Sequence, residues 1–276
     1  MVYVIPSLSV LSLLVGRRIS RAAPTAERGA ATILASSTAA GAKMSATELI
    51  NDESGEAIPM IGPEAAMIAD ALNTSPKDLA AYSTSELRSI LGQSDIVYLA
   101  THGTAIFDSP WQSYLDTKPP CFRVLDLAVL TDCAARLVVF SCCWSGAGSA
   151  NPGSDIVGFA HAMLTSGAQA YIGDLWRTAD MASMLLMVLF CREISSRRRQ
   201  RQSVRLAGAW RSAQITLYHA NKEFVRTLLV EAKDLWGDML QREETKHVLE
   251  LFKHSEKYLD AYLRDYSGKY TDAIST

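Results

Sequence analysis

Two stretches, "YLATHGTA" (residues 98–105) and "LVVFSCCWSG" (residues 137–146), decide the fold of this chain. Each begins as a short apolar run, which is typical of a strand buried on both faces of a sheet. The first run ends at a histidine and a glycine, and the second at a pair of cysteines. Ligands and catalytic groups gather at the carboxyl ends of parallel strands. The two runs therefore predict a parallel sheet with an imidazole and a thiol at the same end.

The segments around these runs alternate between strand and helix patterns. We expect a helix at 84–94 to be N-capped by Thr84 or Ser85, and one at 154–168 to be capped by Ser154 and stopped by Gly167. The alternation predicts an α/β fold, with a mostly parallel sheet sandwiched between helices. The expected strands are 31–37, 95–101, 135–141 and 170–176, and the other expected helices are 62–72, 179–194 and 203–220.

The two ends of the chain differ from this pattern. Residues 2–5 predict a strand, and Ser7 is expected to cap a helix that ends at Arg17 and Arg18. The positive charge follows the apolar run, whereas a secretory signal carries it in front, and the run is shorter than the roughly 20 residues of a membrane span. Residues beyond 221 are charged, amphipathic and free of proline, which predicts two helices outside the sheet. We expect a domain at 1–220 and a helical C-terminal extension at 221–276.

Composition excludes several function classes. The formal net charge of the 276 residues is −2, so we expect neither a nucleic acid nor a membrane as partner. The arginine cluster at 197–205 has no interleaved aromatic residues and is interpreted as a solvated loop between two helices. Five cysteines without a CxxC pair or zinc spacing predict reduced thiols, no metal site and a cytoplasmic location. Four histidines within helical patterns are interpreted as structural: His161, His219, His247 and His254.

His102 and the pair Cys142 and Cys143 have the residue types of a thiol nucleophile with its base. An imidazole beside a thiol raises the reactive thiolate fraction and can later protonate a leaving amine. Gly103 carries no Cβ, so its N–H can approach a substrate carbonyl as part of an oxyanion hole. A Cys-Cys pair at a strand end is more often simple packing. The residues alone therefore leave open whether, and through which cysteine, the chain is catalytic.

Several stretches resemble, in order, the CHAT-domain family of caspase-like cysteine peptidases of clan CD. The family typically reads "LATHG", "LVVLSACETG" and "LARAFLYAGARSVVASLW", followed by an aspartate near a helix start. The corresponding stretches here are "YLATHG", "ARLVVFSCCWSG", "VGFAHAMLTSGAQAYIGDLW" and "ADMASMLLMVLFCREI". The similarity extends from about residue 3 to about residue 219. It implies a caspase-like fold.

The resemblance also implies roles for single residues. In the Ser-x-Cys pattern Cys142 takes a small buried position, so Cys143 is the implied nucleophile and His102 the base. Gly103 and the Cys143 amide would form the oxyanion hole, and the chemistry needs no cofactor. An acidic pocket would favour a basic side chain before the scissile bond, although the nearby Arg177 leaves an acidic one open. The residues implied to line that pocket are Ser141, Asp174, Trp176 and Asp180.

The chain departs from the family pattern at Trp144, which stands where "CETG" has an acidic residue. The first hypothesis is a cysteine endopeptidase acting on protein or peptide substrates and controlled by a regulatory partner or by processing. The main alternative is a non-catalytic interaction or scaffold domain. A third is a hydrolase of the same fold that acts on small molecules.

Overall fold

A five-stranded sheet with every strand parallel forms the centre of the molecule, in the order β10-β7-β3-β1-β2. The structure is a computed structural model, and it describes residues 30–36, 60–130, 133–149, 156–177 and 180–239. The strands are β1 (Ala31–Ala35), β2 (Pro76–Asp78), β3 (Ile96–Ala100), β7 (Leu137–Ser141) and β10 (Tyr171–Gly173).

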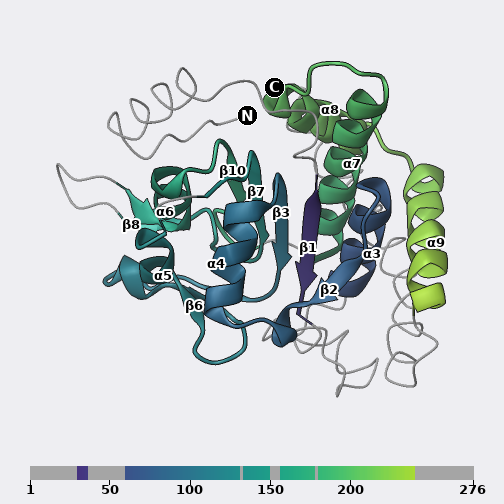
Figure 1. Cartoon of the computed structure of the whole chain (residues 1–276). Coiled ribbons are helices and arrows are strands. Elements are labelled where there is room, and N and C mark those ends of the chain that lie inside the picture. Colours follow the sequence, from purple (N-terminus) through teal and green to yellow (C-terminus); the bar gives the residue numbers. More distant parts are fainter. Residues whose placement is uncertain (1–29, 37–59, 131–132, 150–155, 178–179, 240–276) are drawn as a thin grey trace, which may run out of the picture.

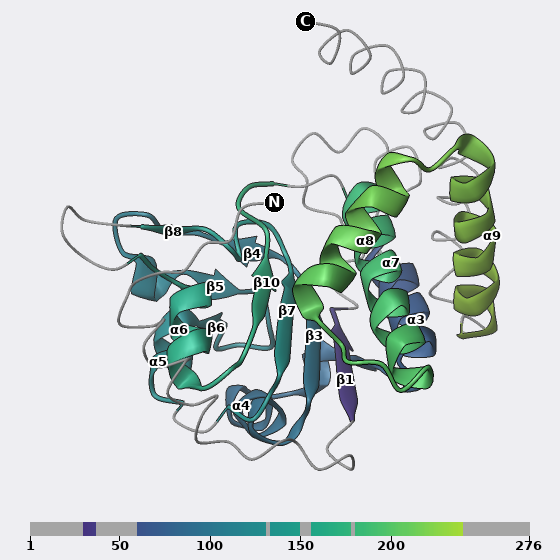
Figure 2. The same cartoon turned by 90° about the horizontal axis from the view of Figure 1, so that it is seen from above.

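Helices cover both faces of the sheet, which confirms the predicted α/β caspase-like architecture (Figures 1 and 2). One face carries α4 (Thr84–Gln93), α5 (Val124–Ala128) and α6 (Phe159–Ser166). The opposite face carries α3 (Ile61–Ala71), α7 (Asp180–Arg199) and α8 (Leu206–Tyr218), and α9 (Lys222–Met239) packs on the outside of α3.

The central strand β3 shows why these apolar runs form a buried sheet. All five of its residues are buried, and they alternate between two apolar cores. Ile96, Tyr98 and Ala100 belong to the core with α3 and α7, whereas Val97 and Leu99 face α4 and α6. A strand that is covered on both faces needs an unbroken apolar run, as the sequence analysis expects.

Small antiparallel sheets extend the carboxyl ends of β3 and β7. Strand β4 (Gly103–Thr104) pairs with β5 (Tyr114–Leu115), which pairs with β6 (Phe122–Arg123). Strand β8 (Gly148–Ser149) pairs with β9 (Val157–Gly158). Short 3-10 helices lie at Leu79–Ala81 and Pro110–Gln112.

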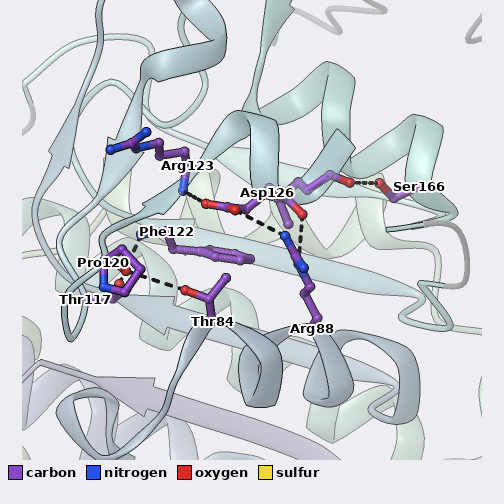
Figure 3. Close-up of polar contacts among 9 residues, drawn as sticks. Thr84, Arg88, Thr117, Pro120, Phe122, Arg123, Asp126 and Ser166 are labelled. Atoms are coloured by element: carbon purple, nitrogen blue, oxygen red, sulfur yellow. Dashed lines mark hydrogen bonds and ion pairs between the residues drawn. The ribbon is translucent and has the colours of Figure 1, made fainter. Parts of the chain in front are cut away.

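Polar contacts tie α5 to its neighbours on either side (Figure 3). The guanidinium of Arg88, on α4, donates to the Asp126 carboxylate over 3.1 Å and to the Asp126 carbonyl over 3.0 Å. On the other side the Ser166 hydroxyl of α6 donates to the Leu127 carbonyl over 2.8 Å. These bonds hold the helical layer together on the side of the sheet that buries Cys142.

Two helix starts differ from the predictions. The N-cap of α4 is Ser83, because its hydroxyl accepts the Glu86 N–H while the Glu86 carboxylate accepts the Ser83 N–H, a capping box. Helix α6 begins at Phe159, not after Ser154, because Val157 and Gly158 pair with β8. Ser154 itself lies outside the described residues. The predicted stop at Gly167 is confirmed, and its φ of 124° suits a residue without a Cβ.

The prediction of an interhelical loop at the arginine cluster is wrong for three of its five arginines. The three arginines 197–199 form the last turn of α7, and only Arg201 and Arg205 lie in the connection to α8. Arg198 pairs with the buried Asp95 at 2.6 Å, and this ion pair joins the end of α7 to the amino end of β3. A second arginine, Arg136, reaches the same carboxylate at 2.9 Å.

Several predictions fall outside the described residues. They are the strand at 2–5, the helix capped by Ser7, the second helix of the C-terminal extension, and the histidines His247 and His254. Of the other two histidines that the sequence analysis interprets as structural, His161 lies in α6 with its ring edge-on to Trp111, and His219 is the C-cap of α8.

Candidate active site

The candidate site lies where the neighbouring strands β3 and β7 end. Their register pairs Ala100 with Ser141, and the next amide, Thr101 N–H, donates to the Ser141 carbonyl over 3.4 Å. His102 follows directly on one side, and Cys142 and Cys143 follow on the other. The tertiary structure therefore brings together the two segments that the sequence separates by about forty residues.

The histidine segment is held by β5 and the residue that follows it. Asp116 N–H donates to the His102 carbonyl over 2.9 Å, and the buried Thr101 hydroxyl donates to the Asp116 carbonyl over 2.6 Å. The His102 side chain is half-buried. These bonds fix the backbone on both sides of His102 while leaving its ring partly accessible.

Gly103 packs directly against the backbone of Cys143. A Cβ on Gly103 would stand closer than 3.0 Å to the Cys143 carbonyl oxygen, and real Cβ atoms essentially never approach that closely. Gly103 is opposite Leu115, and Asp116 N–H bonds one position outward to His102, so Gly103 and Leu115 form a non-hydrogen-bonded pair. The Gly103 N–H is therefore not used by β5.

The two cysteines occupy different environments. Cys142 is buried among Phe140, Phe159 and other apolar residues, and this burial raises the pKa of its thiol well above the ordinary value. Cys143 is half-buried. Within the described part of the chain, the Cys143 amide donates to no backbone carbonyl. At neutral pH the Cys142 thiol stays protonated, which makes it a poor nucleophile.

A tight turn carries the chain away from Cys143. Ser145 N–H donates to the Cys142 carbonyl over 3.2 Å, and Trp144 has a φ of 63°, which is uncommon for a bulky residue. The Trp144 ring meets Phe107 edge to face, with 5.7 Å between ring centroids. Phe107 lies five residues after His102, so this aromatic contact joins the two loops that leave the candidate site.

The residues implied to line the pocket come from three segments. Ser141 ends β7, and Asp174 follows the neighbouring strand β10, where Gly173 is level with Phe140. Ser141 and Asp174 therefore lie at the same end of adjacent strands as Cys143, and both are half-buried. Trp176 is 61% exposed. Asp180 is the first residue of α7, and its side chain is not among those that the structure describes.

A buried acidic residue lies on α3, on one face of the sheet, and contacts β3. Glu64, on α3, is 2% exposed and accepts a hydrogen bond from the Tyr98 hydroxyl of β3. Burial, together with the negative charge of Glu64, raises the pKa of Tyr98 well above its ordinary value, so the phenol stays protonated and keeps this bond. The pair braces β3 two residues before its last residue, Ala100.

Sequence reasoning missed two hydroxyl residues of this region, Thr101 and Ser145. Both are completely buried and bond to the backbone. Thr101 ends the predicted strand at 95–101 and Ser145 follows the one at 135–141, but a polar residue at such a position is usually exposed. Among the described residues, no group of three or more His, Cys, Asp or Glu side chains could hold a metal ion. None of the described helices has the length and apolar character needed to cross a bilayer.

Comparison with known proteins identifies the family pattern. The model of the CHAT domain family matches residues 2–248, most of the chain. No curated protein matches the sequence. The match continues beyond residue 220, and the apolar residues Val225, Leu228 and Ala232 of α9 belong to the same core as α3 and α7. The domain boundary at 220 stays a prediction.

Proposed function

The chain belongs to the CHAT domain family, and from this premise we propose that it is a caspase-like cysteine endopeptidase. In this proposal Cys143 attacks the peptide carbonyl and His102 transfers the proton. The family is related to cysteine peptidases, and the fold is the caspase-like α/β sandwich described above.

One observation carries the proposal: His102 and Cys143 follow adjacent parallel strands whose register matches at Ala100 and Ser141. Both side chains are half-buried, and Gly103 touches the Cys143 backbone. A nucleophile and its base must be near each other and reachable by substrate, and in an empty site the bond between them is often long. Placement at the carboxyl ends of neighbouring strands supports the first requirement, and the half-buried state of both residues supports the second.

The proposed reaction proceeds through an acyl-enzyme. The Cys143 sulfur forms a bond to the carbonyl carbon, and its proton passes to the His102 imidazole. The developing oxyanion would accept hydrogen bonds from the N–H groups of Gly103 and Cys143. Strand β5 does not use the first of these, and the second donates to no backbone carbonyl within the described residues. The C–N bond then breaks, and His102 gives the proton to the leaving amine. Water attacks the thioester while His102 accepts its proton, and the carboxylic acid leaves as the Cys143 thiol is restored.

We further propose that the substrate carries a basic side chain before the scissile bond. Ser141 ends β7, Asp174 follows the neighbouring strand β10, and Trp176 and Asp180 come a few residues later in the chain. Carboxylates at such a pocket favour a cation over an anion. Arg177 is exposed in the same segment and would serve an acidic side chain instead, so a substrate panel has to include both charges. A regulatory protein partner or a processing step would switch the activity.

Trp144 supports a second candidate function, a non-catalytic interaction domain. A bulky ring immediately after Cys143, packed on Phe107, stands where the family pattern has an acidic residue. In a scaffold these aromatic side chains would contact a partner, and Cys143 would be an ordinary thiol.

Labelling with peptidyl acyloxymethyl ketones separates the two functions. The probes carry Arg, Lys, Asp or Leu next to the warhead, and mass spectrometry locates the modified cysteine. We expect labelling at Cys143 with an Arg or Lys probe, lost in His102→Ala and kept in Cys142→Ala. Labelling that is indifferent to His102, or spread over every exposed cysteine, would contradict the peptidase and favour the scaffold.

A further inference from the structure

We propose that Ser145 is a positioning residue that locks the loop carrying Cys143 to the segment after β10, so that the nucleophile and the pocket wall are held as one unit. The inference deepens the proposed function and rests on it for its catalytic consequence. The contacts themselves do not depend on it.

The Ser145 hydroxyl bonds both to β7 and to the first residue after β10. Its side chain is completely buried. The hydroxyl donates to the Phe140 carbonyl of β7 over 2.7 Å and accepts the Asp174 N–H over 3.0 Å. A single hydroxyl thus joins the end of the strand that leads to Cys143 with the first residue after β10.

Two further bonds join the same segments. The Tyr171 hydroxyl of β10 donates to the Ser145 carbonyl over 2.7 Å, and Gly146 N–H donates to the Asp174 carbonyl over 2.8 Å. Burial raises the pKa of the Tyr171 phenol well above its ordinary value, so this donor keeps its proton at neutral pH.

The backbones at this junction are in direct contact. A Cβ added at Gly146 would stand 2.5 Å from the Gly173 carbonyl oxygen, and one added at Gly173 would stand 2.8 Å from the Ser145 hydroxyl oxygen. The two segments are closely packed, and the bonds around Ser145 resist their separation. The position of Cys143, two residues before Ser145, is therefore coupled to that of Asp174.

Amide hydrogen exchange tests this coupling without any assumption about activity. In Ser145→Ala the Asp174 N–H loses its acceptor, so faster exchange there is trivial. The informative amide is Gly146, whose acceptor is untouched by the substitution. We expect Gly146 exchange to accelerate by at least roughly tenfold, because the opening of the junction becomes easier. Acceleration confined to Asp174 would overturn the proposal.

A chemical readout tests the effect on Cys143. Iodoacetamide needs no pocket, whereas a peptidyl acyloxymethyl ketone needs both the thiol and the pocket in register. We expect Ser145→Ala to lower the rate of peptide-probe labelling by about 10- to 100-fold relative to iodoacetamide, because a displacement on the order of 1 Å at a reacting group costs about 100-fold. Ser145→Thr keeps the hydroxyl and is expected to restore most of the ratio.

Ser166→Ala is the matched control. Ser166 is also buried and also donates to a distant backbone carbonyl, that of Leu127 over 2.8 Å, but it lies between α5 and α6 (Figure 3). It is expected to lower stability while leaving both the labelling ratio and Gly146 exchange unchanged. An equal change in Ser166→Ala and Ser145→Ala would mean a general loss of stability and refute the positioning role.

The outcomes remain decisive if one variant or one function fails. If Ser145→Ala does not fold, Tyr171→Phe removes one bond of the junction and is expected to accelerate Gly146 exchange to a smaller degree; unchanged exchange would overturn the proposal. A wild-type protein without peptide-selective labelling would refute the endopeptidase, and the exchange of Gly146 alone would then decide on the junction.

Discussion

Replacing Gly103 by alanine adds one methyl group at the point where the two candidate catalytic segments touch. Gly103 does not have a positive φ, so alanine is compatible with its backbone conformation and the effect is one of space. The new Cβ would stand closer than 3.0 Å to the Cys143 carbonyl oxygen and 3.4 Å from the Cys142 sulfur. Because the nearest atom belongs to the backbone, the Cys143 loop has to move away.

The magnitude follows from that displacement. Overpacking a filled site typically costs about 1–3 kcal/mol of unfolding free energy, and we expect a value in this range. A shift on the order of 1 Å at a reacting group lowers the rate by about 100-fold. Gly103→Ala should therefore remain folded but label at Cys143 with the peptide probe about 100 times more slowly than the wild type.

Gly208→Ala is the matched control for this experiment. Gly208 lies inside α8, where the nearest atom to an added Cβ is 3.8 Å away, an ordinary contact. Alanine at this helical position is expected to stabilise the protein by about 0.5–1 kcal/mol and to leave labelling unchanged. Urea denaturation measures stability, and mass spectrometry measures the labelling rate. A folded Gly103→Ala protein that labels at the wild-type rate would refute the proposal that the candidate site depends on close packing between the segment after β3 and the segment after β7.

Three further predictions test other parts of the structure. Burial raises the pKa of Cys142, so alkylation of the native protein at pH 7 should modify Cys143 and spare Cys142, whereas the unfolded protein should be modified at both, as mass spectrometry would show. Asp95→Asn leaves two partly buried arginines without their shared carboxylate and should cost about 3 kcal/mol in urea denaturation; a loss below about 1 kcal/mol would show that the cluster is solvated. Hydrogen bonds from Ser83 lower the pKa of Glu86 below its ordinary 4.5. Their stabilisation is therefore present above pH 4.5 and is lost as the pH falls through the lowered pKa of the folded state. Glu86→Gln should remove this part of the acid dependence of thermal unfolding, and an unchanged pH profile would contradict the capping box.

The strands and most helices were predictable because their signals are local. The apolar runs of β3 and β7 identify buried parallel strands without knowledge of their neighbours. The capping box of Ser83 and Glu86 is also a local pattern, S-x-x-E, although the prediction chose Thr84 or Ser85 as the cap instead. The start of α6 was not predictable in this way, because Val157 and Gly158 are excluded from the helix by their pairing with β8, a contact that the local sequence does not display.

Contacts between distant segments account for the remaining differences. Arginines at the end of a helical pattern are interpreted as a solvated loop when their partner is unknown. Arg198 lies in the last turn of α7 and reaches Asp95, 103 residues earlier in the chain. The buried role of Ser145 likewise depends on Phe140 and Asp174 meeting at the junction of β7 and β10.

The sequence by itself determined the α/β class, the order of the central strands along the chain, and the residue types at their ends, since these depend on periodicity and on chain-local chemistry. Only the tertiary structure decided that β3 and β7 are neighbours in register, which brings the segments of His102 and Cys143 to the same end of the sheet and sets Gly103 against the Cys143 carbonyl. It also decided which cysteine is buried and that the Ser145 hydroxyl joins Phe140 of β7 to Asp174 after β10. The physical reason is that packing and hydrogen bonds between segments far apart in the chain leave no periodic pattern in the sequence from which they could be predicted.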